Sequence, residues 1–416
     1  MSVEVFFSYA HKDEDLRDEL AKHLSILKRQ GVITAWYDRD IDAGREWAKE
    51  IDQHLNSAQI ILLLISPDFM ALDYCYDIEL ERAMKRHEAG EARVIPIILR
   101  PVDWSGAAFS KLQALPKNAQ PITDWTSRDQ AFMDAARGIR VAIEELETTQ
   151  LKTKQQTSLK LYSALLKLGY RQQARLFRRA IESESVAAFL IHGLPEYGQR
   201  WLLNRLVVQY LPHSLNSKVV KVDLSRRVRR SDVSALWREL GGRVHLRGKQ
   251  LSPPEIADRV YRWWLTQDVI FVFHDANIMP EAALHELINQ FWLPLASKVK
   301  AASSQESDRK LLMFLVDYEG RAEKWNILFV EKLDVSWDPQ KPIKPPRIQE
   351  FTDGELMAWL EDQYHDLPAE LTYGIDDRVE EILANSEGGI PELAFREICD
   401  RCGVDWFEEL ETWQKL

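Results

Sequence analysis

Polar side chains stand directly after three apolar runs near the start of the chain. Ser8 and Tyr9 follow the first run, Asp38 follows the second, and Ser66 follows the third. If the runs are parallel strands, their carboxyl ends meet at one edge of a sheet, where α/β proteins bind ligands. Hydroxyl and carboxylate groups at that edge can bind the sugar hydroxyls or phosphates of a ligand.

A cluster of acids follows the third run. A helix is expected to begin near residue 73, and it carries Asp77, Glu79 and Glu81. A carboxylate can stabilise positive charge that develops on a substrate in the transition state. On a helix, residues 77 and 81 share a face and residue 79 points about 160–200° away from them, so the acids are not interchangeable.

The sequence of residues 1–147 predicts the sheet that would position these side chains. Its strands are continuous apolar runs rather than alternating patterns, which is typical of a parallel sheet covered on both faces. Helices are expected at residues 13–30, 45–56 and from 73 onward, and a period near 3.6 predicts another at 129–146. We therefore expect an α/β, flavodoxin-like, doubly wound sheet of about five strands.

Five segments in this region resemble the TIR domains of bacterial, plant and animal immune proteins. They occur in the order typical of that family, and they are Val5-Phe6-Phe7-Ser8-Tyr9-Ala10-His11, Trp36-Tyr37-Asp38-Arg39-Asp40-Ile41-Asp42-Ala43-Gly44, Ile60-Ile61-Leu62-Leu63-Leu64-Ile65-Ser66-Pro67, Tyr74-Cys75-Tyr76-Asp77-Ile78-Glu79-Leu80 and Val94-Ile95-Pro96-Ile97-Ile98-Leu99. Many TIR domains cleave NAD⁺ with a single glutamate. The resemblance therefore implies an NAD⁺ hydrolase or cyclase that releases nicotinamide.

The resemblance implies that Glu79 is the catalytic acid, in the first turns of the helix after the third strand. The family places this glutamate just beyond an aromatic residue or a cysteine, and Tyr74 and Cys75 match that pattern. Many relatives have a gap of three residues after the cysteine, whereas here the gap is four. Asp77 or Glu81 therefore stays open as the catalytic acid, and a solvated surface role stays open for Glu79.

The same resemblance supplies the binding residues. Phe7, Ser8 and Tyr9 would line the nicotinamide ribose and ring, although Ser8 capping a helix and Tyr9 packing locally is the alternative. Residues 38–44 resemble the BB loop, which closes over the pocket and makes contacts between TIR domains. The loop carries Asp38, Arg39 and Gly44, and Trp47 just after it would provide either an aromatic wall or a buried core side chain.

A second glycine-containing loop lies near the middle of the chain. Gly193 and Gly198 stand five residues apart between an expected strand and an expected helix, as in a P-loop. However, Gln199 occupies the lysine position and Arg200 the serine or threonine position. Apolar runs at 269–275 and 311–317 end in acids, like the following strands of such a sheet. This part resembles a STAND nucleotide-binding fold that has lost the residues for ATP hydrolysis.

These patterns divide the chain into four expected segments. Residues 1–147 form the TIR domain, 148–160 a linker or a solvated helix extension, and 161–348 the degenerate STAND domain, which resembles a P-loop NTPase. Residues 349–416 are acidic and mostly helical, and would form a helical lid or a winged-helix-like segment.

Charge is distributed unevenly over the 416 residues, which carry a net charge of −11. Residues 148–250 have a net charge of +14, between flanking regions of −8 and −17. Such a block binds either nucleic acid or acidic parts of the same chain, and of these the sequence favours acidic parts of the same chain. Three cysteines, the lack of a long apolar run and the lack of a leader pattern suggest a cytoplasmic protein without a membrane span.

Together these features predict a TIR-domain NAD⁺ hydrolase or cyclase that a STAND-like domain controls through homo-oligomers built on contacts between TIR domains. The resemblance implies a role in bacterial anti-phage immunity. The alternative is a non-enzymatic TIR scaffold that recruits other TIR proteins. No cofactor is expected, because NAD⁺ would be the substrate, and no metal is expected, because Cys399 and Cys402 have no third ligand nearby in the sequence.

Overall fold

A computed structural model describes most of the chain in two compact units, residues 1–153 and 154–416. The described residues are 2–36, 53–71, 75–211, 217–225, 233–246, 251–302, 309–325, 329–334 and 337–413. For residues 35, 36, 75–79 and 233 it describes the backbone alone.

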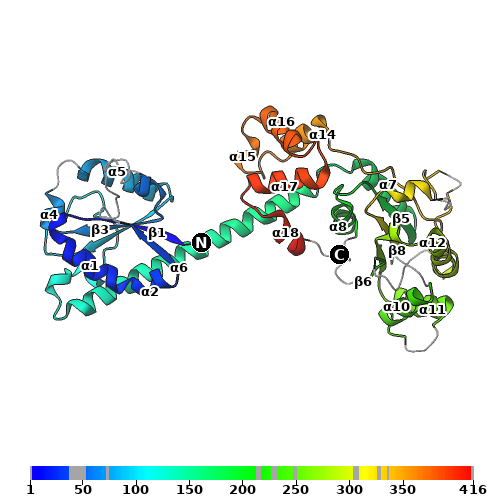
Figure 1. The fold of residues 1–416 in the computed structure, drawn as a ribbon, viewed down its shortest axis with the longest axis horizontal. Helices are drawn as coiled ribbons and strands as arrows, with labels where there is room; N and C mark the ends of the chain where they lie inside the picture. The colour runs from blue at the N-terminus through cyan, green and yellow to red at the C-terminus, as the bar shows by residue number, and fades with distance from the viewer. Residues whose placement is uncertain are drawn as a thin grey trace. The chain divides into compact units, whose positions relative to one another are not determined.

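A parallel sheet forms the centre of the first unit, in the strand order β2-β1-β3-β4. Helices cover both faces (Figure 1). The strands are β1 Val3–Ser8, β2 Ile33–Trp36, β3 Ile60–Ile65 and β4 Arg93–Ile98, and the helices are α1 Glu14–His23, α2 Ser25–Arg29, α4 Pro67–Met70, α5 Cys75–Glu88 and the start of α6 Arg128–Leu165. The predicted α/β class and doubly wound parallel arrangement are confirmed.

Two apolar cores account for this layering. One face of the sheet packs against α1, α2 and α6, with Leu20, Leu27 and Phe132 buried there. The opposite face packs against α5, through Leu80 and Ala83. The side chains of β3 are buried throughout the strand, which explains its unbroken run of isoleucine and leucine.

The described part of this sheet has four strands, whereas the sequence suggested about five. Beyond β4 the chain makes only an isolated parallel bridge, between Ile97 and Leu115. Leu115 exchanges backbone hydrogen bonds with Pro96 and Ile98, each 2.8 Å long. The next backbone N–H that could face β4, that of Lys117, donates instead to Asp134 Oδ2 at 2.7 Å, so the pairing stops after one residue.

The second unit contains another parallel sheet, in the order β5-β8-β7-β6. The expected strands after the glycine loop are confirmed as β7 and β8. The strands are β5 Val186–His192, β6 Lys218–Asp223, β7 Val269–His274 and β8 Leu311–Asp317, and the helices are α7 Arg171–Ser183, α8 Gln199–Tyr210, α10 Val233–Arg243, α11 Pro253–Trp264, α12 Glu281–Glu286 and α13 Leu293–Ala302. One core joins α7 and α8 to the sheet, and a second core joins α10, α11 and α13 to its other face (Figure 1).

Residues 148–160 lie inside α6 and have helical backbone throughout. Of the two interpretations of this polar segment, a linker or a helix extension, the described backbone is that of a helix. Threonine side chains within it bond to carbonyls one turn earlier, as Thr148 does to Glu144 at 2.7 Å.

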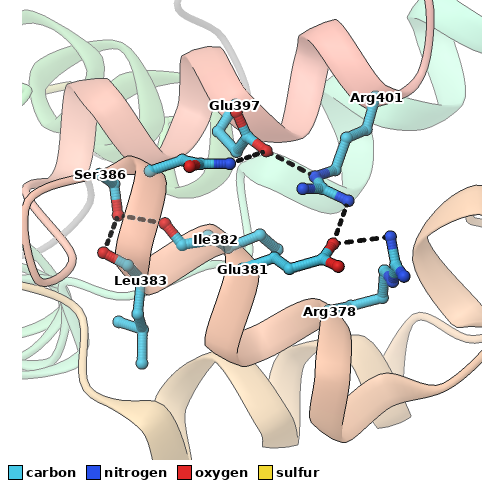
Figure 2. Close-up of polar contacts among 8 residues, drawn as sticks. Arg378, Glu381, Ile382, Leu383, Ser386, Glu397 and Arg401 are labelled. Atoms are coloured by element: carbon cyan, nitrogen blue, oxygen red, sulfur yellow. Dashed lines mark hydrogen bonds and ion pairs between the residues drawn. The ribbon is translucent and has the colours of Figure 1, made fainter.

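The end of the described chain is helical. It consists of α14 Asp353–Asp362, α15 Ala369–Thr372, α16 Ile375–Asn385, α17 Pro391–Arg401 and α18 Trp406–Trp413. A polar clamp holds α16 to α17, because Arg401 binds Glu397 at 2.6 Å and Glu381 at 2.7 Å (Figure 2). Arg378 also binds Glu381, at 2.7 Å. Phe395 of α17 and Trp406 of α18 belong to the same apolar core as side chains of β5.

Candidate functional site

The carboxyl edge of the first sheet is the candidate site. Ser8 ends β1 and is half-buried, and Tyr9 follows it, also half-buried. Phe7 is 2% exposed and packs in the core under α1 and α6, and its contact with the nicotinamide ribose or ring stays a prediction. Strand alternation explains why Phe7 and Ser8 differ in exposure, since successive side chains along β1 point to opposite faces.

The ring of Tyr9 makes a cation–π contact with the buried side chain of Arg17. The guanidinium of Arg17 lies 4.8 Å from the centre of the Tyr9 ring. Arg17 is 1% exposed and also binds Glu14 at 3.1 Å and Asp18 at 3.2 Å. The ring is thereby fixed in place at the strand end, and cation–π contacts of this kind are stronger when desolvated.

A polar hub joins the ends of three strands. Asp13, at the N-terminus of α1, is 1% exposed and accepts hydrogen bonds from Ser66 and from Nε of Arg100, the latter at 2.7 Å. Ser66 in turn accepts from the backbone N–H of Phe69 at 3.1 Å and so caps α4. The hub ties β1, β3 and β4 together at the edge where a ligand would bind.

Arg100 extends the hub to the surface. Its Nη2 atom contacts Asp68, which also binds Lys12 at 2.8 Å. Hydrogen bonds from Asp13 and Asp68 raise the pKa of Arg100, and the bonds from Arg100 and Lys12 lower the pKa of Asp68. Arg100 and Asp68 are therefore charged at neutral pH. The hub combines residues 13, 66, 68 and 100, and no sequence pattern linked them beyond the position of Ser66 at a strand end.

The proposed catalytic position lies in α5, which follows β3 and α4. Cys75 begins this helix and Glu79 stands in its second turn, one turn before the buried Ala83. Glu81, one of the open alternatives, is exposed and paired with Lys85 at 2.8 Å, and that bond lowers its pKa. Tyr74, Asp38, Arg39, Gly44 and Trp47 lie outside the described residues.

The glycine loop of the second unit has a filled interior. Gln199 is 2% exposed, and its Nε2 atom donates to the carbonyl of Leu194 at 2.8 Å and to that of Asp317 at 3.4 Å. Gly198 adopts φ +71°, and a Cβ there would meet the Tyr170 hydroxyl at 2.3 Å. The loop therefore has the P-loop layout, but an internal amide takes the place where a lysine would reach phosphates.

Two aromatic side chains lie near Arg200, the residue at the serine or threonine position of the P-loop pattern. Arg200 is exposed and lies near Tyr318 and His274. His274 Nδ1 and the Tyr318 hydroxyl are 2.7 Å apart. Burial raises the pKa of Tyr318 to about 12, and burial with the charges of Arg200 and Lys221 lowers the pKa of His274 to about 4.

Comparison with protein-family models finds one known domain in each of the two units. Residues 5–134 match the TIR domain model, and residues 165–316 match the model for an inactive STAND domain. The chain therefore carries a TIR domain followed by an inactive STAND domain, as the sequence predicted.

Individual relatives cover parts of the chain. A protein of Sinorhizobium fredii (strain NBRC 101917 / NGR234), described as the uncharacterized protein y4lF, is 57% identical over 145 residues, which are 35% of this chain and 45% of that protein. The chain thus spans less than half of the length of this curated relative.

Solved structures give weaker likenesses. The Aeropyrum pernix ORC1 protein in complex with DNA is 15% identical over 57% of this chain and 58% of that chain, with a TM-score of 0.31. Drosophila ORC bound to DNA is 9% identical over 62% of this chain and 65% of that chain, with a TM-score of 0.29. TM-scores of this size carry no argument about fold or ligand. Among the described helices, none is long and apolar enough to cross a membrane.

Proposed function

We propose that the TIR domain cleaves NAD⁺ at the nicotinamide–ribose bond and that Glu79 is the acid that stabilises the transition state. The observation that carries the proposal is the position of residue 79 in α5, the helix that follows β3 and α4, within the residues that match the TIR model. Nicotinamide leaves as a neutral group, and positive charge develops on the ribose. A single carboxylate beside the ribose is then sufficient to stabilise this charge in the transition state.

The polar hub supports this proposal because its hydrogen bonds hold the carboxyl edge of the sheet, where the substrate would bind. Catalytic groups need to be held within fractions of an ångström of the productive geometry. Asp13, Ser66 and Arg100 join the segments that follow β1, β3 and β4, and Arg17 contacts the ring of Tyr9. Tyr9 would stack on the nicotinamide ring, and Ser8 would hydrogen-bond a ribose or phosphate oxygen.

The inactive STAND domain would control when the TIR domain acts. Because Gln199 bonds to the carbonyl of its own loop, control would depend on assembly rather than on ATP turnover. We propose that the active form is an oligomer whose contacts use residues 38–44, which lie outside the described part of the chain. Depletion of NAD⁺, or a cyclic product, would then serve bacterial anti-phage immunity in the cytoplasm.

The decisive experiment incubates the purified full chain with NAD⁺ and separates the products by chromatography. The proposal predicts release of nicotinamide, and Glu79→Gln should abolish it. The assay is run on fractions whose mass is measured by light scattering, because activity should appear in the assembled fractions. If no fraction releases nicotinamide but the chain binds a second TIR protein, the non-enzymatic scaffold becomes the better explanation.

A further inference from the structure

A basic groove runs between α7 and α8 in the second unit. It has a volume of about 490 Å³. None of the side chains that line it is acidic, and five of them are arginines: Arg171, Ala174, Arg175, Arg178, Arg179, Arg205 and Tyr210. The groove therefore has a strongly positive lining.

The arginines of α7 form a row. Residues 171, 175, 178 and 179 fall within about 100° of the helix circumference and extend over about 12 Å of its length. All four are exposed. Their opposite side of the helix is apolar, since Ala174, Phe177 and Ala180 pack into the core.

The row keeps most of its charge available. Arg178 pairs with Glu182 at 3.0 Å, and Arg179 donates to the neutral carbonyl of Leu333 at 3.2 Å. Within the part of the chain that the structure describes, Arg171 and Arg175 have no acidic partner. No described acidic side chain of the second unit therefore pairs with these two arginines; for the basic block as a whole, the interpretation that it faces acidic parts of the same chain stays a prediction.

Arg205 adds a buried positive charge to the wall of the groove. It is 6% exposed, and its bonds go to the neutral oxygens of Leu168 at 2.8 Å, Gly169 at 2.6 Å and Gln209 at 3.1 Å. Burial lowers its pKa, and the nearby Arg171 lowers it further. An anion in the groove would offset this repulsion, because a buried charge without an opposite charge is costly.

We propose that the α7–α8 groove binds the phosphodiester backbone of a nucleic acid. Guanidinium groups match phosphate oxygens in pairs of parallel hydrogen bonds. A row of arginines on one open helix face fits a line of phosphates, whereas a single small anion is usually held in an enclosed cradle. The contacts reach backbone rather than bases, so binding is independent of sequence. This site does not require the TIR domain to cleave NAD⁺.

The test measures fluorescence anisotropy of a labelled single-stranded oligonucleotide and of its duplex, titrated with the full chain at several salt concentrations. The groove variant is Arg171→Gln with Arg175→Gln, because both side chains are exposed and their loss should leave the fold intact. The matched control is Arg262→Gln with Lys300→Gln, which removes two exposed charges from α11 and α13 in the same unit. Circular dichroism confirms that both variants are folded.

The groove variant should weaken binding about 100-fold or more, because it removes two charge-assisted phosphate contacts that each contribute about tenfold or more to the affinity. For the single strand it should also reduce the slope of log K against log salt by about 1.4, the value for two lost phosphate contacts. The control should keep the wild-type affinity and slope. Absence of oligonucleotide binding by the wild type, equal losses in both variants, or equally tight binding of labelled poly-glutamate would overturn the proposal. Poly-glutamate binding would instead indicate an acidic protein partner.

Discussion

Arg100 Nε donates a 2.7 Å hydrogen bond to Asp13 Oδ1, and this contact joins the end of β4 to the N-terminus of α1. The two residues are 87 positions apart in the chain. The carboxylate of Asp13 is almost completely buried and also accepts a hydrogen bond from Ser66. The bond therefore determines how firmly the carboxyl edge of the TIR sheet is held.

Removing that charge should destabilise the TIR domain. We expect Asp13→Ala to lower the free energy of unfolding by about 3 kcal/mol, because Ser66 Oγ and Arg100 Nε lose their acceptor and Arg100 keeps only Asp68. Urea unfolding of the full chain measures the change. Asp15→Ala is the matched control, since Asp15 is an exposed acid in the same helix and should change stability by about 0.5 kcal/mol or less. Equal effects of the two substitutions would show that the hub does not stabilise the domain.

Glu79→Gln should reduce nicotinamide release about 100-fold or more, because the amide keeps the size of the side chain and loses the charge that stabilises the transition state. Chromatography of the products of NAD⁺ measures this rate. Glu81→Gln is the control, since Glu81 is exposed and bound to Lys85.

That control also tests the alignment across the gap after Cys75. If Glu79→Gln retains near-normal turnover while Asp77→Asn or Glu81→Gln abolishes it, the catalytic acid has been assigned to the wrong position. If all three variants turn over normally, the reaction does not depend on an acid of α5.

The second unit should not hydrolyse ATP. Gln199 provides no cation for the outer phosphates, and its amide is bonded to Leu194 and Asp317 instead. Release of inorganic phosphate from ATP by the full chain measures this activity. Turnover that disappears in Asp275→Ala would contradict the prediction, whereas binding without turnover is compatible with it.

Gln199→Ala should destabilise the glycine loop, because the carbonyl of Leu194 loses its donor inside the protein. We expect a loss of about 1–3 kcal/mol in the free energy of unfolding. Thermal unfolding of the full chain measures the change, with Gln172→Ala on the exposed face of α7 as the control. An unchanged melting temperature would mean that water replaces the amide at no cost.

His274 should make the protein less stable in mild acid. Its pKa falls from 6.5 to about 4 in the folded chain, so between these two pH values the unfolded chain binds more protons than the folded one. Stability contributed by the neutral imidazole is therefore complete above pH 6.5 and is lost as pH falls toward 4.

Comparison with His274→Gln isolates this effect, because the other titrating groups are common to both proteins. We expect the stability difference between wild type and variant to shrink as the pH falls from 7.5 to about 4.5, measured by urea unfolding at each pH. A difference that stays constant over this range would show that His274 titrates normally.

The sequence by itself determined the order of elements and both domain classes. Continuous apolar runs at β1, β3, β7 and β8 predicted buried parallel strands, because only strands covered on both faces can be apolar along their whole length. The glycine spacing with Gln199 at the lysine position predicted a P-loop layout without its chemistry. Such signals are local, so they can be read from neighbouring residues.

Only the tertiary structure decided which distant residues meet. Asp13 and Arg100 form the hub through strand order, and Phe7 lies in the core because of the direction in which it leaves β1. The pairing beyond β4 is limited to Leu115, because the next donor, the N–H of Lys117, bonds to Asp134 instead of to β4. Likewise the spacing of the arginines in α7 can be read from the sequence. Only the packing of α8 against α7 places the buried Arg205 beside them. These contacts depend on chain segments that lie far apart in the sequence, and no local pattern encodes them.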